Sequence, residues 1–242
     1  MDRFNLKTFG STSKGVCHIV EICDKKIMLD CGVNPKKFLD ELKNIDFGVL
    51  VCEHSDHAKY LKEFLKYRIR FYMSQGTKKA LNIEDIYAYH LSVPRTKIIM
   101  PSDLLPPLLL TIIPVKHDAK EPTAFIIDYK DVIIAYLVDL KLGNEYLELE
   151  KFDPTHIIIE CNYIDSIIEE NVNKGKINLS LYKRITKYHS SLEDTKKFLQ
   201  ELQKHSPNLE QVYLTHISEV NGDPDIIKEE IQKILGVEVY VV

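Results

Sequence analysis

Six consecutive residues, Cys52-Glu53-His54-Ser55-Asp56-His57, bring together a thiol, two imidazoles and two carboxylates. The segment lies between the apolar residues 48–51 and a stretch with helical spacing, so we expect a loop at a strand end, where binding and catalytic residues are commonly placed. Zinc takes imidazole nitrogen, carboxylate oxygen and thiolate sulfur as ligands. The segment therefore predicts a metal site. The alternative is a polar helix start, in which Ser55 or Asp56 caps the helix and both histidines are surface residues.

Further candidate ligands follow three other apolar runs. His117 follows residues 108–115, Asp139 follows residues 133–138 and His216 follows residues 212–215. A buried acid directly after a β-branched strand is costly unless it is paired, hydrogen-bonded or bound to metal. These three positions, together with the first segment, predict a dinuclear site.

The elements that must position these residues are short strands and amphipathic helices. We expect strands at 16–22, 26–29, 48–51, 70–73, 108–114, 123–128, 132–137, 156–160, 211–214 and 238–242. We expect helices at 34–42, 57–67, 74–81, 179–188, 192–204 and 225–235. Two β-rich halves with helices outside predict an α/β fold, a four-layer αββα sandwich, in a single domain over residues 1–242.

Composition narrows the function classes. The net charge of −4 argues against a protein that coats nucleic acid non-specifically, because such binding depends on lysine and arginine, although a local basic patch is compatible with it. The five cysteines are scattered and odd in number, which favours free thiols over a disulfide framework. Without a recognisable signal region or a membrane-spanning apolar run, the sequence predicts a cytoplasmic protein with no membrane partner.

In combination, these segments resemble the metallo-β-lactamase superfamily. Residues 53–57 are similar to its HxHxDH motif, and His117, Asp139 and His216 stand in the order of its later ligand motifs. Residues 10–15 (GSTSKG) resemble its glycine-serine turn, and residues 28–32 (MLDCG) resemble its LxDxG strand end. The segments most similar to the YycJ (WalJ) branch, which is related to ribonuclease Z, are 117–119, 160–163, 189–191 and 215–218.

The resemblance implies a pair of divalent ions, Zn²⁺ or Mn²⁺, with a defined set of ligands. The first ion would be held by Cys52, His54 and His117, the second by Asp56, His57 and His216, and Asp139 would bridge them. A water between the ions would be the nucleophile, because two cations lower its pKa and stabilise the attacking and leaving oxygens. Asp56 is therefore expected to be catalytic as well as a ligand.

The ribonuclease Z relationship also implies a role for His189. In that branch, the histidine of such a motif acts on the leaving group and the scissile phosphate and is oriented by a glutamate, which Glu160 matches here. A carboxylate raises the pKa of a histidine and fixes its ring, which makes a suitable general acid near neutral pH. The alternatives are a helix-capping surface histidine and a structural ion pair. The expected function is a phosphodiesterase or nuclease acting on a nucleic acid or nucleotide, and homodimers are common in related enzymes.

Two departures from the family pattern leave other functions open. Cys52 replaces the first histidine of the motif, and Val138-Asp139-Leu140-Lys141 stands where the family more often has a threonine before the aspartate and a glycine two residues after it. A thiolate binds zinc well, but a buried cysteine is also commonly a small core residue. The alternatives are a cyclic-nucleotide phosphodiesterase of phage or bacterial origin, a catalytically impaired binding protein, and a hydrolase of lactones or thioesters, which would not need His189.

Other titratable residues are expected to play supporting parts. Asp30 and Asp118 are interpreted as partners that orient ligands rather than as ligands. The remaining histidines are expected to be structural or exposed, and these are His18, His90, His156 and His205.

Overall fold

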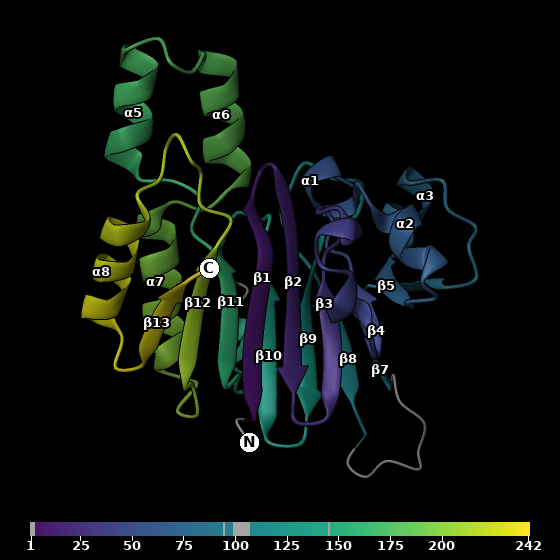
Figure 1. The fold of residues 1–242 in the computed structure, drawn as a ribbon. Helices are drawn as coiled ribbons and strands as arrows, with labels where there is room; N and C mark the ends of the chain where they lie inside the picture. Colours follow the sequence, from purple (N-terminus) through teal and green to yellow (C-terminus); the bar gives the residue numbers. More distant parts are fainter. Residues whose placement is uncertain (1–2, 94, 99–106, 145) are drawn as a thin grey trace. The chain divides into compact units, whose positions relative to one another are not determined.

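The computed structural model describes residues 3–93, 95–98, 107–144 and 146–242, which form two compact units (Figure 1). Unit 1 consists of Met1–Pro114 and Ala119–Val132, and unit 2 consists of Val115–Asp118 and Ile133–Val242. The chain contains two mixed sheets flanked by helices, which confirms the expected α/β class. The single domain over residues 1–242 stays a prediction.

Unit 1 contains a six-stranded sheet with its strands in sequence order. The first three strands pair antiparallel and the later ones pair parallel. Its strands are β1 (Phe4–Thr12), β2 (Gly15–Ile22), β3 (Lys25–Leu29), β4 (Phe47–Val49), β5 (Phe71–Ser74) and β6 (Ala88–Leu91). Strand β2 is buried along nearly its whole length, whereas β1 is an edge strand of intermediate burial. The edge position explains why β1 was not predicted, since it carries no strongly apolar face.

Helices of unit 1 pack their apolar side chains with those of this sheet in one core that includes Ile19, Met28, Phe64 and Phe71. The helical elements are η1 (Pro35–Lys37), η2 (Leu39–Leu42), α1 (Ser55–Ala58), α2 (Leu61–Lys66) and α3 (Gln75–Ala80). Helix α3 lies within the predicted range 74–81, and the side chain of Ser74 caps it by accepting from the Thr77 N–H.

Two predicted helices of unit 1 were wrong in form. The range 34–42 is two short 3₁₀ helices, because Phe38 between them has a non-helical φ of −150° and stacks its ring on Phe9 with centroids 4.0 Å apart. The range 57–67 is broken at Tyr60, whose N–H donates to the carbonyl of Cys31 instead of continuing a helix. In both segments a tertiary contact overrides the helical periodicity.

Unit 1 also contains an antiparallel series of three strands. They are β7 (Arg95–Ile98), β8 (Leu109–Pro114) and β9 (Thr123–Tyr129). The start of β9 is joined to the segment after β4, because the Thr123 N–H donates to the Val51 carbonyl at 3.1 Å. This bond fixes the backbone just before Cys52.

Unit 2 is built on four parallel strands, in the order β10-β11-β12-β13 (Figure 1). They are β10 (Val132–Leu137), β11 (His156–Glu160), β12 (Gln211–Thr215) and β13 (Glu238–Val241). Their β-branched side chains are largely buried, as is usual for parallel strands covered on both faces. The carboxyl ends of β10, β11 and β12 therefore meet at one edge of the sheet.

The helices of unit 2 are α4 (Tyr146–Leu149), α5 (Asp165–Asn173), α6 (Leu179–Tyr188), α7 (Leu192–Gln203) and α8 (Pro224–Ile234). Helices α5 and α6 form a hairpin (Figure 1), with a small core that contains Tyr163, Ile168 and Ile177. The predictions for α6, α7 and α8 are confirmed to within one residue at each end, whereas α4 and α5 were not predicted. None of the helices within the described part of the chain has the length and apolar character that crossing a bilayer would take.

Candidate metal centre

The strand register of unit 2 places three of the predicted residues at one edge. Leu137 of β10 pairs with Ile159 of β11, which pairs with Leu214 of β12. Asp139, Glu160 and His216 follow within two residues of these positions, so all three lie at the carboxyl ends of neighbouring parallel strands. The sequence could place each at a strand end, but only the register brings them together.

His189 reaches the same edge from the junction of two helices. It is the C-cap of α6, and its N–H donates to the Ile185 carbonyl at 2.9 Å. Two residues later, Ser191 caps α7 through a capping box with Asp194. Because one helix ends and the next begins around His189, its position is fixed from both sides.

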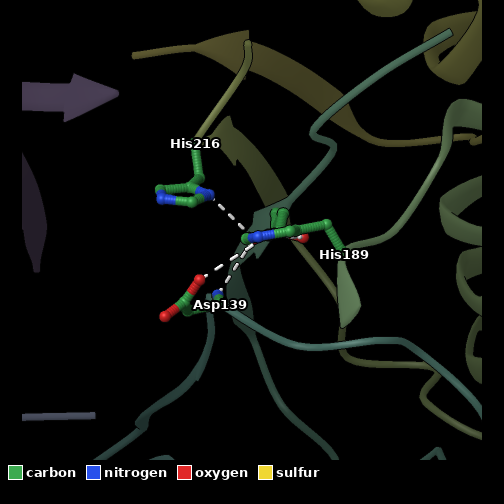
Figure 2. Close-up of side chains that lie close together, drawn as sticks. Asp139, His189 and His216 are labelled. Carbon is green, nitrogen blue, oxygen red and sulfur yellow. Dashed lines mark hydrogen bonds and ion pairs between the residues drawn. The ribbon is translucent and has the colours of Figure 1, made fainter. Parts of the chain in front are cut away.

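The side chains of Asp139, His189 and His216 point toward one another in Figure 2. With Glu160 they form a fully buried group, in which one ligand atom of each residue lies within 4.8 Å of those of the others. Nδ1 of His189 is 3.6 Å from Oδ1 of Asp139, and the rings of His189 and His216 stack with centroids 5.5 Å apart. Such convergence of imidazoles and carboxylates is what a metal site requires.

Glu160 lies at the middle of this group. Its Oε2 is 2.8 Å from Nδ1 of His216, and both of its oxygens are 3.2 Å from Nδ1 of His189. It also accepts from the backbone N–H groups of Asp139 at 3.0 Å and Ser190 at 2.9 Å. Burial raises the pKa of Glu160, but the charges and hydrogen bonds of His189 and His216 outweigh burial and lower this pKa from 4.5 to about 2. Glu160 is therefore an anion at neutral pH.

His117 is oriented by the end of α6. Its Nδ1 lies 3.2 Å from the carbonyl of Tyr188, so Nδ1–H donates there and Nε2 is left as an acceptor. That Nε2 is 2.7 Å from Oδ2 of Asp139. A neutral imidazole nitrogen and a carboxylate oxygen repel each other at this distance unless a proton or a cation lies between them. This pair fits a bound cation.

The neighbouring Asp118 connects His117 to an arginine. Its Oδ1 lies 3.1 Å from Nε2 of His117, and its carboxylate accepts two hydrogen bonds from Arg184, from Nε at 2.6 Å and from a terminal nitrogen at 3.3 Å. Arg184 is on α6 and half exposed. Because Asp118 contacts Nε2, the nitrogen left for a metal ion, its interpretation as an orienting residue stays a prediction. Arg184 was not assigned a role from the sequence.

In unit 1, the predicted segment forms a tight turn at the start of α1. His54 is the N-cap, and its carbonyl accepts from the N–H groups of His57 and Ala58. Nε2 of His57 lies 3.8 Å from Oδ2 of Asp56. Cys52 is buried, with 1% of its surface exposed. These four candidate ligands are thus close neighbours along one turn.

Asp30 holds this turn from β3. Its Oδ2 is 2.7 Å from Nδ1 of His57, and its Oδ1 accepts from the Val51 N–H at 3.0 Å. The carboxylate fixes the proton on Nδ1, so Nε2 of His57 is the nitrogen left for a ligand, as in metal sites where a carboxylate orients the histidine. Asp30 therefore has the orienting role expected from the sequence.

Three of these residues have a left-handed backbone. The φ angles are 58° for Asp30, 61° for Asp139 and 56° for His216. Non-glycine residues adopt this region rarely and at a cost, and such residues cluster at functional sites.

The donor atoms of these candidate ligands fit divalent metal ions. His57, His117 and His216 each use Nδ1 in a hydrogen bond to a carboxylate or a carbonyl, so each has Nε2 as its acceptor. Acceptor nitrogens with buried carboxylates such as Asp139 match the ligands of zinc and manganese.

Other supporting residues were not assigned a role from the sequence. Ser190 Oγ donates to the Leu140 carbonyl and accepts from the Leu142 N–H, which ties the segment after Asp139 to the α6–α7 junction. Asn162 donates to the His216 carbonyl at 2.8 Å. Both lie beside residues that the family motifs singled out, which was the available signal.

The histidines expected to lie outside the site do so. His18 contacts Thr8 Oγ1 at 2.9 Å, and His156 contacts Thr155 Oγ1 at 2.9 Å. His90 is exposed on β6, and His205 is half exposed near Glu150.

Comparison with known families decides the assignment of the fold. Residues 25–217 match the β-lactamase superfamily domain. The chain belongs to the β-lactamase superfamily. The two mixed sheets flanked by helices are accordingly the metallo-β-lactamase form of the α/β sandwich.

Several solved structures are similar over nearly the whole chain, and one of them is a metallo-β-lactamase fold protein. The protein YhfI from Bacillus subtilis has a TM-score of 0.73 at 13% identity, covering 100% of this chain and 97% of its own. A diphosphatase of the PhnP family has a TM-score of 0.64 at 17% identity, covering 99% and 95%. The short form of human tRNase Z has a TM-score of 0.63 at 14% identity, covering 98% and 95%. No curated protein matches the chain significantly.

Proposed function

We propose that this β-lactamase superfamily protein is a metal-dependent phosphodiesterase or nuclease of the YycJ type, the branch related to ribonuclease Z. The observation that carries the proposal is the contact between His189 and Glu160, with Nδ1 of the histidine 3.2 Å from both carboxylate oxygens. Superfamily members that open lactams or cleave thioesters do not require this pair. The similarity to a PhnP-family diphosphatase and to human tRNase Z supports the same chemistry.

The metal ligands in the proposal are those implied by the family pattern. Two divalent ions, Zn²⁺ or Mn²⁺, would be held by the candidate ligands, which are Cys52, His54, Asp56, His57, His117, Asp139 and His216. When bound, two such ions activate a water and stabilise negative charge on the phosphate oxygens. Among the protein groups, Asp56 is a carboxylate beside His57 that can accept a hydrogen bond from the attacking water and so orient it.

In the pair of His189 and Glu160, the histidine supplies the proton that the leaving group needs. Because Nδ1–H of His189 donates to Glu160, the second ring nitrogen, Nε2, presents its proton away from the carboxylate. As the bond from phosphorus to the leaving oxygen breaks, His189 transfers this proton to that oxygen and becomes neutral. The buried Glu160 anion stabilises the imidazolium before the transfer and holds the ring in position throughout.

Elemental analysis and hydrolysis of bis-p-nitrophenyl phosphate test the proposal together. We expect two ions per chain in the wild type, and loss of turnover in Asp139→Ala. His189→Ala should keep its metal but slow cleavage by roughly two to four orders of magnitude, the usual scale for a general acid. His205→Ala, which removes a half-exposed histidine outside the group, is the control and should be unchanged. If the metal-loaded wild type is inert and only Cys52→His turns over, the chain is a binding protein and the proposal is wrong.

A further inference from the structure

A pocket on unit 1 has the composition of an anion site. It has a volume of about 280 Å³, and its polar lining residues are Thr12, Lys14, Asn34, Lys37, Lys59 and Tyr60. We call it the lysine pocket. Three lysines face it, and no acidic residue is among the described residues that line it.

The lysine pocket shares its wall with the turn that carries the candidate ligands. Gly32 lines the pocket, and a Cβ atom at this position would lie 1.6 Å from the carbonyl oxygen of Asp56, so only glycine permits the contact. The Lys59 N–H donates to the Ser55 carbonyl at 3.1 Å. A group in the pocket would therefore lie directly beside the backbone of the turn from Ser55 to Lys59.

Lys37 and Lys59 of the pocket contrast with two other lysines of unit 1. Lys7 and Lys26 both pair with Glu41 at 3.0 Å. Within the described ranges, Lys37 and Lys59 make no ion pair with a carboxylate, and Lys59 lies 5.5 Å from the centre of the Tyr60 ring. Like charges facing one pocket are unfavourable until an anion binds between them. The charge arrangement favours a phosphate.

The aromatic part of the lining indicates what the phosphate is attached to. Phe9 and Tyr60 both line the pocket, beside its lysines. Lysines next to aromatic rings are the combination with which proteins bind single-stranded nucleic acids, whose phosphates are neutralised while a base or sugar contacts a ring. Because the net charge of the chain is −4, such binding must come from a local cluster of this kind.

We propose that the lysine pocket binds a phosphate of a single-stranded polynucleotide, on a nucleotide that flanks the phosphate to be cleaved. The inference rests on the proposed function and adds a substrate class to it. The strand would be held by Lys37 and Lys59 beside the turn that contains Asp56, so a single-stranded end can reach the site without a separate binding domain.

Fluorescence anisotropy with a labelled ten-residue oligothymidine tests binding without any need for turnover. In the presence of EDTA, the double variant Lys37→Ala/Lys59→Ala should bind about ten times more weakly than the wild type. The slope of the logarithm of its association constant against the logarithm of the salt concentration should be smaller in magnitude than that of the wild type by about 1.4, because each phosphate contact on a single strand contributes about 0.7 to this slope. The matched control, Lys36→Ala/Lys62→Ala, removes two exposed lysines that lie within three residues of Lys37 and Lys59 in the sequence but do not line the pocket, and it should bind within twofold of the wild type.

Hydrolysis assays separate this inference from the proposed function. Bis-p-nitrophenyl phosphate has one phosphate, so kcat/KM for this substrate should be the same in both double variants. In contrast, kcat/KM for the oligonucleotide should fall about tenfold in Lys37→Ala/Lys59→Ala and stay unchanged in the control. Equal losses of oligonucleotide binding in the two double variants would overturn the proposal that the lysine pocket binds the strand. The proposal would also be overturned if adenosine monophosphate bound as tightly as the oligonucleotide and displaced it, because the pocket would then need only a single nucleotide. If nothing is hydrolysed but the binding difference persists, the proposed function fails and the pocket stands.

Discussion

Glu160 accepts a hydrogen bond from Nδ1 of His216 that is 2.8 Å long, shorter than its 3.2 Å contacts with His189. One buried carboxylate thus orients both a candidate metal ligand and the candidate general acid. The family pattern implied only the second of these roles. Metal binding and proton transfer are coupled through a single side chain.

Substitution of Glu160 should therefore affect metal binding as well as catalysis. In Glu160→Gln, the charge that holds Nδ1–H of His216 is lost, and we expect zinc affinity to fall about 10- to 100-fold, the usual effect of removing the partner of a ligating histidine. His189→Ala should leave zinc affinity within about twofold. Calorimetric titration of both variants with zinc gives the comparison. Equal affinities in Glu160→Gln and the wild type would show that Glu160 serves His189 alone.

The acid stability of the metal-free protein should depend on the same carboxylate. The pKa of Glu160 is lowered from 4.5 to about 2 in the folded protein, so its contribution is complete above pH 4.5 and is lost as the pH falls toward 2. Each proton taken up on unfolding changes the unfolding free energy by at most about 1.4 kcal/mol per pH unit. Urea unfolding between pH 2 and 5 should show a shallower slope for Glu160→Gln than for the wild type. Parallel curves would contradict the prediction.

In unit 1, Asp30 should be as important for metal binding as Glu160 is in unit 2, because it holds the turn of residues 52–57 that carries candidate ligands (the ligand turn). In Asp30→Asn, the amide has only one acceptor oxygen and no negative charge, so it cannot accept from both His57 Nδ1 and the Val51 N–H. We therefore expect a 10- to 100-fold loss of zinc affinity. Asp46→Asn makes the same chemical change where the carboxylate accepts from the Lys26 N–H, outside the ligand turn, and should have no effect on zinc. The test is a competition assay against a chromophoric chelator. A similar affinity in both variants would remove the role assigned to Asp30.

Cobalt substitution tests whether Cys52 binds metal. We expect the cobalt-loaded wild type to show a thiolate-to-cobalt charge-transfer band that Cys52→Ser lacks. Cys17→Ser is the control, because Cys17 is also buried but lies within β2, outside the ligand turn, and burial raises the pKa of its thiol well above the usual range. A spectrum unchanged by Cys52→Ser would mean that Cys52 is a core residue and that the first ion has one ligand fewer.

Much of unit 2 could be predicted from local patterns. Helices α6, α7 and α8 combine amphipathic spacing with capping side chains at Asn178, Ser191 and Asp223. Helix α5 was missed because its N-cap residue, Ile164, makes no side-chain capping hydrogen bond and its apolar residues are less concentrated on one face than those of α6. Local signals are sufficient where a helix has both a wide apolar face and a cap.

The residue types of the site were also predictable, but their connections were not. Motif order and strand ends pointed to Asp139, His189 and His216 as separate candidates. The bond from Glu160 to His216 depends on Glu160 pairing with Thr215 between two parallel strands, which are separated in the chain by the three helices α5, α6 and α7. Such register is set by the packing of distant segments, so no local pattern contains it.

The left-handed backbone at Asp30, Asp139 and His216 has a consequence for attempts to engineer the protein. Glycine adopts this conformation without strain, so replacing any of these residues by glycine would relieve local strain while deleting a carboxylate or an imidazole. A screen for heat resistance alone would not detect the loss of the carboxylate or imidazole, because it measures only the stability of the fold. Directed evolution of this protein should therefore select for turnover in every round.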